Sequence, residues 1–177
     1  LKVLIVINLV LCLSSCASNK KEDKKVISTI VDGAGRTVNV YEDGDKATAA
    51  SVYFVATPFF VALDMSDRVL AVNTRNNFWK KADEGLNKAG TVGKGNVDLE
   101  KLAEYNPSVL IHRSNDPETI EAVSKLDIDT ICITVENAQD IIDTLEMLGT
   151  YFAKQENAKK AIDWFNSKIE LIDSIVD

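Results

Sequence analysis

Three cysteines and a single histidine carry the most distinctive chemistry in this chain of 177 residues. A structural zinc site usually takes four closely spaced ligands, whereas Cys12, Cys16, Cys132 and His112 are scattered along the sequence. No serine lies in a Gly-x-Ser-x-Gly motif, so His112 has no evident nucleophile to activate. The sequence therefore predicts neither a metal site nor a catalytic histidine.

Two glycine-containing segments match nucleotide-binding motifs poorly. Residues 90–95 read Gly-Thr-Val-Gly-Lys-Gly, which lacks both the spacing of a P-loop and the Ser or Thr that binds Mg²⁺. Residues 32–36 lie between two expected strands instead of between a strand and a helix, which excludes a dinucleotide fingerprint. We expect no enzymatic activity and no resident cofactor.

Cys16 follows Leu-Ser-Ser at the end of an apolar run, residues 3–13. As a helix this run would reach about 16 Å, which is too short to span a bilayer but suits a signal-peptide core. Leu-Ser-Ser-Cys resembles the bacterial lipobox, whose cysteine thiol receives diacylglycerol. We expect a lipoprotein signal peptide over 1–15 and an anchor at Cys16 on the extracytoplasmic face. A plain secretory signal with an incidental cysteine is the alternative.

Residues 16–25 are polar and charged, which predicts a flexible tether. The chain carries 27 acidic against 20 basic residues, a net charge of −7, and this acidity argues against a nucleic-acid partner. Cys132 stands between two isoleucines, so we expect an inert buried thiol.

Beyond the tether, apolar patterning predicts strands that alternate with helices. The predicted strands are 26–31, 37–40, 47–51, 68–73, 108–111 and 129–135. The predicted helices are 57–65, 97–105, 116–126, a segment capped by Asn137, and 155–177. Strands separated by helices favour an α/β fold with a parallel sheet and right-handed crossovers.

The last predicted helix, 155–177, has an apolar stripe at spacings of three and four. The stripe consists of Ala158, Ile162, Phe165, Ile169, Ile172 and Val176. Such a stripe must be covered, and we expect the helix to lead into a second domain. Packing wholly on this domain, or dimerisation, are the alternatives.

The order of several segments resembles one family. These segments are 29–38, 68–72, 92–102, 105–111 and 118–135. Over 26–177 they are similar to the periplasmic-type solute-binding proteins of ABC importers for iron–siderophores, haem and cobalamin. The resemblance implies a three-layer α/β lobe at 26–154 with an N-terminal hairpin. It also implies that 155–177 begins a long helix leading to a second lobe, which this chain lacks.

The resemblance implies a substrate-binding lipoprotein that captures an iron(III)–siderophore or related metal chelate. Its partners would be an ABC permease and the ATPase subunits of that importer. We expect the chain alone to bind chelates weakly, because one lobe leaves much of a ligand in water. A one-lobe surface lipoprotein, acting as an adaptor or as a truncated product that binds no ligand, is the alternative function.

Ligands of open α/β sheets bind beyond the carboxyl ends of the strands. The loops expected there carry aromatic, polar and cationic side chains. The candidate ligand-binding residues are Tyr53, Thr57, Phe59, Arg75, Phe78, Trp79, Lys94, Asn96 and Arg113. Aromatic rings suit stacking on a planar chelate, and the cations suit anionic oxygens. Burial in the core and exposure on the surface are their respective alternatives.

In the family that the sequence resembles, each lobe presents an acidic residue to arginines of the permease. Glu100, in the helix after the glycine-containing loop, matches that position in the first lobe. A carboxylate near a helix N-terminus also stabilises its own helix, which is the alternative role.

Overall fold

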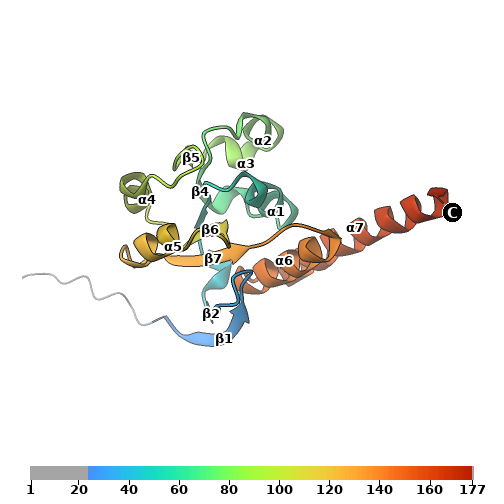
Figure 1. The fold of residues 1–177 in the computed structure, drawn as a ribbon, viewed down its shortest axis with the longest axis horizontal. Coiled ribbons are helices and arrows are strands. Elements are labelled where there is room, and N and C mark those ends of the chain that lie inside the picture. Colours follow the sequence, from blue (N-terminus) through green and yellow to red (C-terminus); the bar gives the residue numbers. More distant parts are fainter. Residues whose placement is uncertain (1–23, 177) are drawn as a thin grey trace, which may run out of the picture.

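The structure is a computed structural model that describes residues 24–176 (Figure 1). The predicted signal peptide and Cys16 lie outside the described residues. The strands are β1 (Val26–Val31), β2 (Thr37–Tyr41), β3 (Ala49–Ala50), β4 (Val69–Val72), β5 (Gly90–Thr91), β6 (Val109–Arg113) and β7 (Asp129–Ile133). The helices are α1 (Thr57–Ala62), α2 (Asn77–Ala82), α3 (Glu84–Asn87), α4 (Leu99–Tyr105), α5 (Pro117–Ser124), α6 (Ala138–Tyr151) and α7 (Gln155–Val176).

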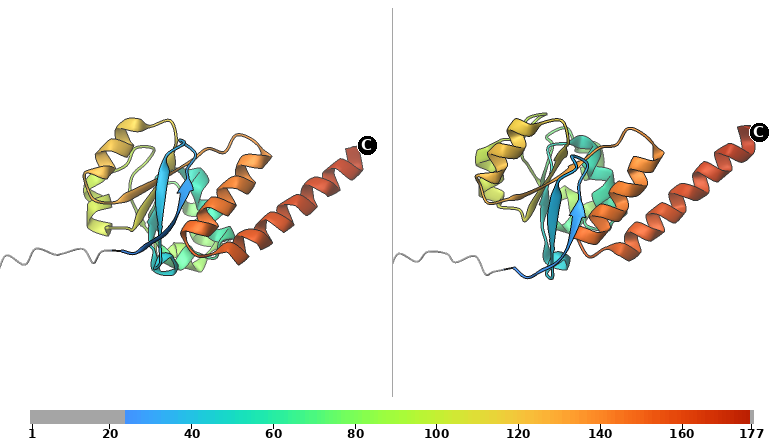
Figure 2. Two further views of the ribbon diagram at one scale, coloured as in Figure 1. Left: turned by 90° about the horizontal axis from the view of Figure 1, so that it is seen from below. Right: turned by 60° about the horizontal axis from the view of Figure 1, so that its bottom comes forward.

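Five strands form one parallel sheet in the order β5-β4-β3-β6-β7, and β1 pairs with β2 in a separate antiparallel hairpin. Successive β6 residues face opposite layers: Ile111 packs in the larger cluster with α1 and α6, and Leu110 packs in the smaller one with α4 and α5. Figure 2 shows these helices on either side of the sheet. The predicted three-layer α/β fold with a hairpin is confirmed.

The helix caps predicted at Asp116 and Asn137 are present in the structure. The Asp116 side chain accepts a hydrogen bond from the Thr119 amide, and Pro117 occupies the first turn of α5. The Asn137 side chain accepts from the Asp140 amide in a reciprocal capping box. The expected helix at 97–105 starts later, because Asp98 is its cap instead of part of its first turn.

Other boundaries were predicted too widely or missed. Residues 47–51 contribute a strand of only two residues, β3. The helix expected at 57–65 ends at Ala62, and Asp64 adopts a positive φ of 54° just beyond it. Helices α2 and α3 and strand β5 were not predicted, because their short segments have no apolar periodicity.

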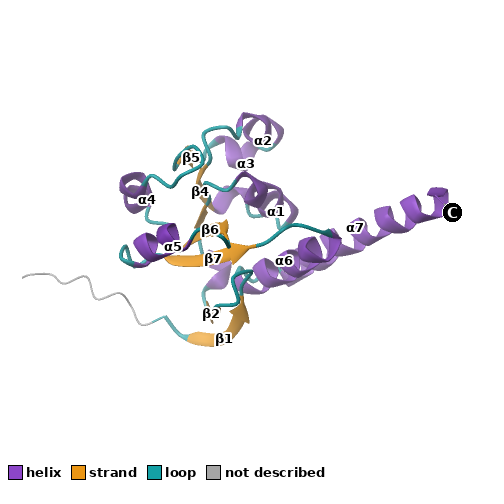
Figure 3. Ribbon diagram, in the orientation of Figure 1, coloured by secondary structure: helices purple, strands orange, loops and turns teal. Residues whose placement is uncertain are grey.

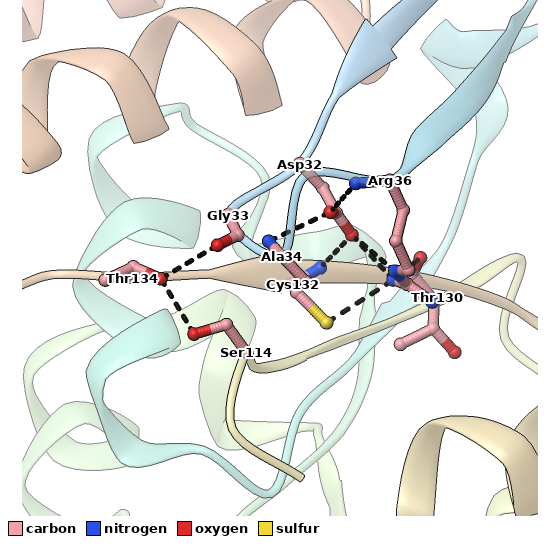
Figure 4. Close-up of polar contacts among 8 residues, drawn as sticks. All are labelled: Asp32, Gly33, Ala34, Arg36, Ser114, Thr130, Cys132 and Thr134. Atoms are coloured by element: carbon pink, nitrogen blue, oxygen red, sulfur yellow. Dashed lines mark hydrogen bonds and ion pairs between the residues drawn. The ribbon is translucent and has the colours of Figure 1, made fainter. Parts of the chain in front are cut away.

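The hairpin is fastened to the sheet by a group that we call the hairpin clasp: Asp32, Arg36, Thr130 and Cys132 (Figure 4). The Arg36 guanidinium donates to Asp32 Oδ2 at 2.6 and 3.0 Å, to the Thr130 carbonyl at 2.8 Å, and to Cys132 Sγ at 3.3 Å. The Cys132 amide also donates to Asp32 Oδ2, at 3.0 Å. The clasp thus joins residues about one hundred positions apart.

Gly33 allows the close approach that the clasp requires. Its amide donates to the Cys132 carbonyl at 2.8 Å, and a Cβ there would lie 2.8 Å from the Thr134 nitrogen. Burial raises the pKa of the Cys132 thiol to about 11, which keeps the thiol protonated. The predicted burial of Cys132 is confirmed.

Helix α7 packs through its first half only. Ala158 is buried beside α6, while Ile169, Ile172 and Ile175 are exposed on the part that extends away from the lobe (Figures 1 and 2). The predicted long helix is therefore present, and its apolar face is uncovered over the C-terminal half.

Candidate functional site

The five strands of the sheet are parallel, so the loops that follow them all leave from its carboxyl edge. Figure 3 shows the strands and their connecting loops. Strand order runs outward from β3 through β4 to β5, and from β6 to β7 on its other side. The topological switch point therefore lies between β3 and β6. Crevices at such points are where open α/β sheets bind ligands.

Buried polar side chains hold these loops in place. Ser51 donates its hydroxyl to the Ile111 carbonyl at 2.8 Å and accepts from the Tyr53 amide at 3.0 Å. Asn73 donates to the Val52 carbonyl at 2.7 Å. Because these bonds tie neighbouring loops to one another, the rim of the sheet is a firm support for a ligand.

A hollow of about 350 Å³ opens on this rim. We call it the cationic hollow; its lining residues are Phe54, Asn73, Arg75, Lys94 and Gly95. The Asn73 side-chain oxygen accepts from the Arg75 amide at 2.8 Å, and the Thr74 amide donates to the Gly93 carbonyl at 2.9 Å. These bonds bring the loop of Arg75 beside the loop of Lys94.

Glycines on both sides of Lys94 shape the hollow. Gly93 has a φ of 134°, and a Cβ there would lie 2.0 Å from the Asn96 carbonyl oxygen. Gly95 has a φ of 95°, with open space where a Cβ would stand. Only glycine adopts these backbone conformations easily, so the turn that presents Lys94 depends on them.

The two cations of the hollow are free to meet a ligand. Neither Arg75 nor Lys94 has a side-chain hydrogen bond or ion pair among residues 24–176, and both are exposed. Phe54, also in the lining, keeps 45% of its surface exposed. The structure thus combines two predicted site residues with an aromatic ring and an amide.

Arg113 belongs to a different group. It donates to Asp116 at 2.9 Å, and the same carboxylate oxygen lies 3.1 Å from His112 Nε2. The hydrogen bond with His112 is the main cause of a strongly lowered pKa at Asp116, while burial lowers the pKa of His112. His112 is thus neutral near pH 7, and part of the Arg113 charge is already compensated.

The other predicted ligand-binding residues are dispersed. Thr57 and Phe59 are buried in α1, where Thr57 accepts a hydrogen bond from Asn76 at 2.9 Å and Phe59 packs in the core. Tyr53 and Trp79 are half-buried against the core, and Asn96 is exposed.

Phe78 is 69% exposed and meets Trp79 edge to face, with ring centroids 5.3 Å apart. Glu100 is exposed in the first turn of α4.

Phe54 and Asn73 were missed as individual site residues. The sequence does contain one indication of Asn73 as a site residue: a polar amide directly follows a buried strand at the carboxyl edge of the sheet. The sequence contains no such indication for Phe54, since nothing in its context distinguishes it from the buried Phe59 and Phe60.

Two further observations concern the described residues only. No three His, Cys, Asp or Glu side chains within 24–176 gather closely enough to hold a metal ion. No helix in the same range has both the length and the apolar character to cross a membrane.

Comparison with known proteins gives a consistent result. Residues 50–177 match the family described as periplasmic binding protein. The fold is similar to that of a periplasmic solute binding protein from Veillonella parvula, with 21% identity, a TM-score of 0.73, and coverage of 83% of this chain and 47% of that one. No curated protein matches the sequence.

Two other similar structures have ligands in their names. The siderophore binding protein BauB, solved with two acinetobactin molecules and ferric iron, has 15% identity and a TM-score of 0.66, covering 85% of this chain and 54% of BauB. The heme binding protein HmuT has 14% identity and a TM-score of 0.66, covering 87% and 50%. At these identities the likeness shows the fold, and this chain spans about half the length of the proteins it matches.

Proposed function

The chain belongs to the periplasmic binding protein family, and on that premise we propose that it captures a metal chelate for delivery to an ABC importer. The family is one of solute-binding proteins that act outside the cytoplasm. The proposed ligand is an iron(III)–siderophore, haem or cobalamin, with the metal bound as cargo inside its chelate. The proposed role is binding without catalysis.

The observation that carries this proposal is the cationic hollow beside the carboxyl ends of β3, β4 and β5. This carboxyl edge of the strands is the edge at which open α/β sheets bind ligands. Buried Ser51 and Asn73 support the surrounding loops, while Arg75 and Lys94 have no ion-pair partner among residues 24–176. Proteins of similar fold named as siderophore and heme binding add support for the ligand class.

The test is a titration of the protein with ferric enterobactin, ferrichrome, haemin and cyanocobalamin, followed by amide NMR. This readout detects weak as well as tight complexes. We expect shifts or paramagnetic broadening to concentrate at 73–76 and 93–96 for at least one chelate. If none of the four perturbs these amides at millimolar concentration, the proposed function is wrong.

We further propose that Cys16 holds the protein on the outer side of the cytoplasmic membrane through a diacylglycerol anchor. A single acyl chain binds membranes only reversibly, so two chains are needed for a durable anchor. Cys16→Ala should release the protein from the membrane fraction, whereas Cys132→Ala should not. If the Cys16→Ala protein still partitions into detergent, the anchor lies elsewhere.

The proposed contact with the permease is Glu100, which is exposed in the first turn of α4. Arginines of a permease could pair with this carboxylate in a bidentate manner. Glu100→Arg should reduce uptake by cells carrying the importer and leave chelate affinity unchanged. Glu84→Arg, an exposed charge reversal in the first turn of α3, is the matched control. Undiminished uptake by Glu100→Arg would remove Glu100 from the docking surface.

A further inference from the structure

The cationic hollow is an exception on an acidic protein. The chain carries a net charge of −7, yet among the described residues no acidic side chain lines this hollow and two basic ones do. Elsewhere in the described chain, Arg36, Arg113 and Lys125 each pair with a carboxylate. The missing counter-charges for Arg75 and Lys94 therefore need an explanation.

Lack of an ion pair is not sufficient by itself, because other lysines are also unpaired. Lys46 and Lys88 are exposed and have no ion pair among residues 24–176, but neither lines the hollow. What distinguishes Arg75 and Lys94 is convergence: the Thr74–Gly93 hydrogen bond joins their loops, and both side chains border one space with the Phe54 ring.

This arrangement has a clear chemical complement. A guanidinium offers planar, paired donors to an oxyanion, an ammonium adds a second positive charge, and an aromatic ring offers a flat apolar face. A ligand with anionic oxygens around an aromatic or planar framework satisfies all three groups at once. A neutral ligand would desolvate the two cations without pairing them, which opposes its binding.

We propose, building on the proposed function, that the cationic hollow selects chelates whose outer surface is anionic over neutral or cationic ones. The recognised groups are catecholate or carboxylate oxygens held close to the metal or on its macrocycle. Ferric tris-catecholates and the propionates of haem share this chemistry, whereas ferric trihydroxamates and cyanocobalamin lack it. Arg75 and Lys94 are thus the residues that determine specificity at this rim.

The experiment compares two double variants with the same change in net charge. Arg75→Gln/Lys94→Gln removes both cations of the hollow, and Lys46→Gln/Lys88→Gln removes two exposed cations outside it. Each protein is titrated with ferric enterobactin (trianionic), haemin (anionic through its propionates), ferrichrome (neutral) and ferrioxamine B (cationic), with amide NMR as the readout.

We expect ferric enterobactin or haemin to bind the parent protein at least about tenfold more tightly than ferrichrome and ferrioxamine B. Arg75→Gln/Lys94→Gln should weaken the anionic chelate by about tenfold, as expected for two partly solvated charge-assisted contacts. The control variant should stay within about twofold, since distant exposed charges are screened by salt. Whether enterobactin or haemin shows the larger loss distinguishes catecholate from propionate recognition.

Two results would overturn the inference and leave the proposed function standing. One is ferrichrome or ferrioxamine B binding at the hollow as tightly as the anionic chelates. The other is an equal loss of affinity in the two double variants. Absence of binding by every chelate would instead contradict the proposed function itself.

Discussion

The hairpin clasp and the cationic hollow use the same residue type in opposite ways. In the clasp, Arg36 donates hydrogen bonds to a carboxylate, a carbonyl and a sulfur, and the Asp32 side chain is fully buried. In the hollow, Arg75 is exposed and its side chain has no partner among residues 24–176. A satisfied charge stabilises a fold, whereas an unsatisfied one at a binding edge is available to a ligand.

The contrast extends to a second arginine. The Arg68 guanidinium donates to the carbonyls of Gly44 at 3.0 Å, Asp45 at 2.6 Å and Phe152 at 3.3 Å, and it also lies over the Phe152 ring. It joins the loop before β3 to the end of α6, so its role is structural. Counting arginines in a sequence therefore says little about binding until their partners are known.

The largest effect expected from this contrast is on stability. Arg36→Ala leaves the buried Asp32 carboxylate without its guanidinium and should cost about 3 kcal/mol of unfolding free energy. This value is at the lower end for buried pairs because Arg36 is about one-third exposed. Arg75→Ala should change stability by about 0.5 kcal/mol or less. Chemical denaturation measures both, and equal losses would contradict the distinction between clasp and hollow.

A second prediction asks whether backbone geometry maintains the hollow. Gly93→Ala forces a Cβ against the Asn96 carbonyl and should cost about 2 kcal/mol, while displacing Lys94. Gly95→Ala meets no neighbour and should cost only about 1 kcal/mol for its positive φ. Chemical denaturation and titration with an anionic chelate test the two glycine variants together. Unchanged stability in Gly93→Ala would mean that the turn adapts and does not constrain Lys94.

Much of the fold was predictable because it depends on local patterns. Two β-rich runs joined by the glycine-containing segment 32–36 predicted the hairpin. Asp116-Pro117 and Asn137 predicted helix starts that the structure confirms. The clasp was not predictable, because Asp32 and Cys132 are one hundred positions apart and only the folded chain brings them together.

The candidate site was predictable at the level of loops and less so for single residues. Arg75 and Lys94 lie together because their loops follow the adjacent parallel strands β4 and β5, and β5 was not among the predicted strands. The burial of Phe59 and the exposure of Phe54 depend on how the segment between β3 and α1 turns against the core, and apolar patterning does not determine that.

The group formed by His112, Arg113 and Asp116 lies between the fully paired clasp and the unpaired cations of the hollow. This group responds to pH. His112 is buried, and its Nδ1 has no hydrogen-bond partner within the described residues 24–176. Burial lowers its pKa below 6.5, although Asp116 opposes the shift. The unfolded chain therefore binds a proton more readily than the folded one. Stability that is fully present above about pH 6.5 should fall as the pH drops toward the lowered pKa of the folded state.

The test uses the fact that His112 is the only histidine of the chain. Unfolding free energies at pH 7.5 and pH 5.5 should show the loss, and the titration of the imidazole C2 proton reports the pKa of the folded state directly. A folded-state pKa at or above 6.5 would show that Asp116 and not burial dominates.

A small effect on stability is also expected at Phe78, and it distinguishes two roles for the aromatic pair. Phe78 is 69% exposed, so Phe78→Ala should cost about 0.5 kcal/mol, mainly from the edge-to-face contact with Trp79. Trp79 packs against the core, and Trp79→Ala should cost more, about 2 kcal/mol. If Phe78 stacks on a bound chelate, its removal weakens binding about threefold while the unfolding curve hardly moves. A loss above 1 kcal/mol with unchanged affinity would instead make Phe78 an anchor of its loop, and the binding surface would then be confined to the cationic hollow.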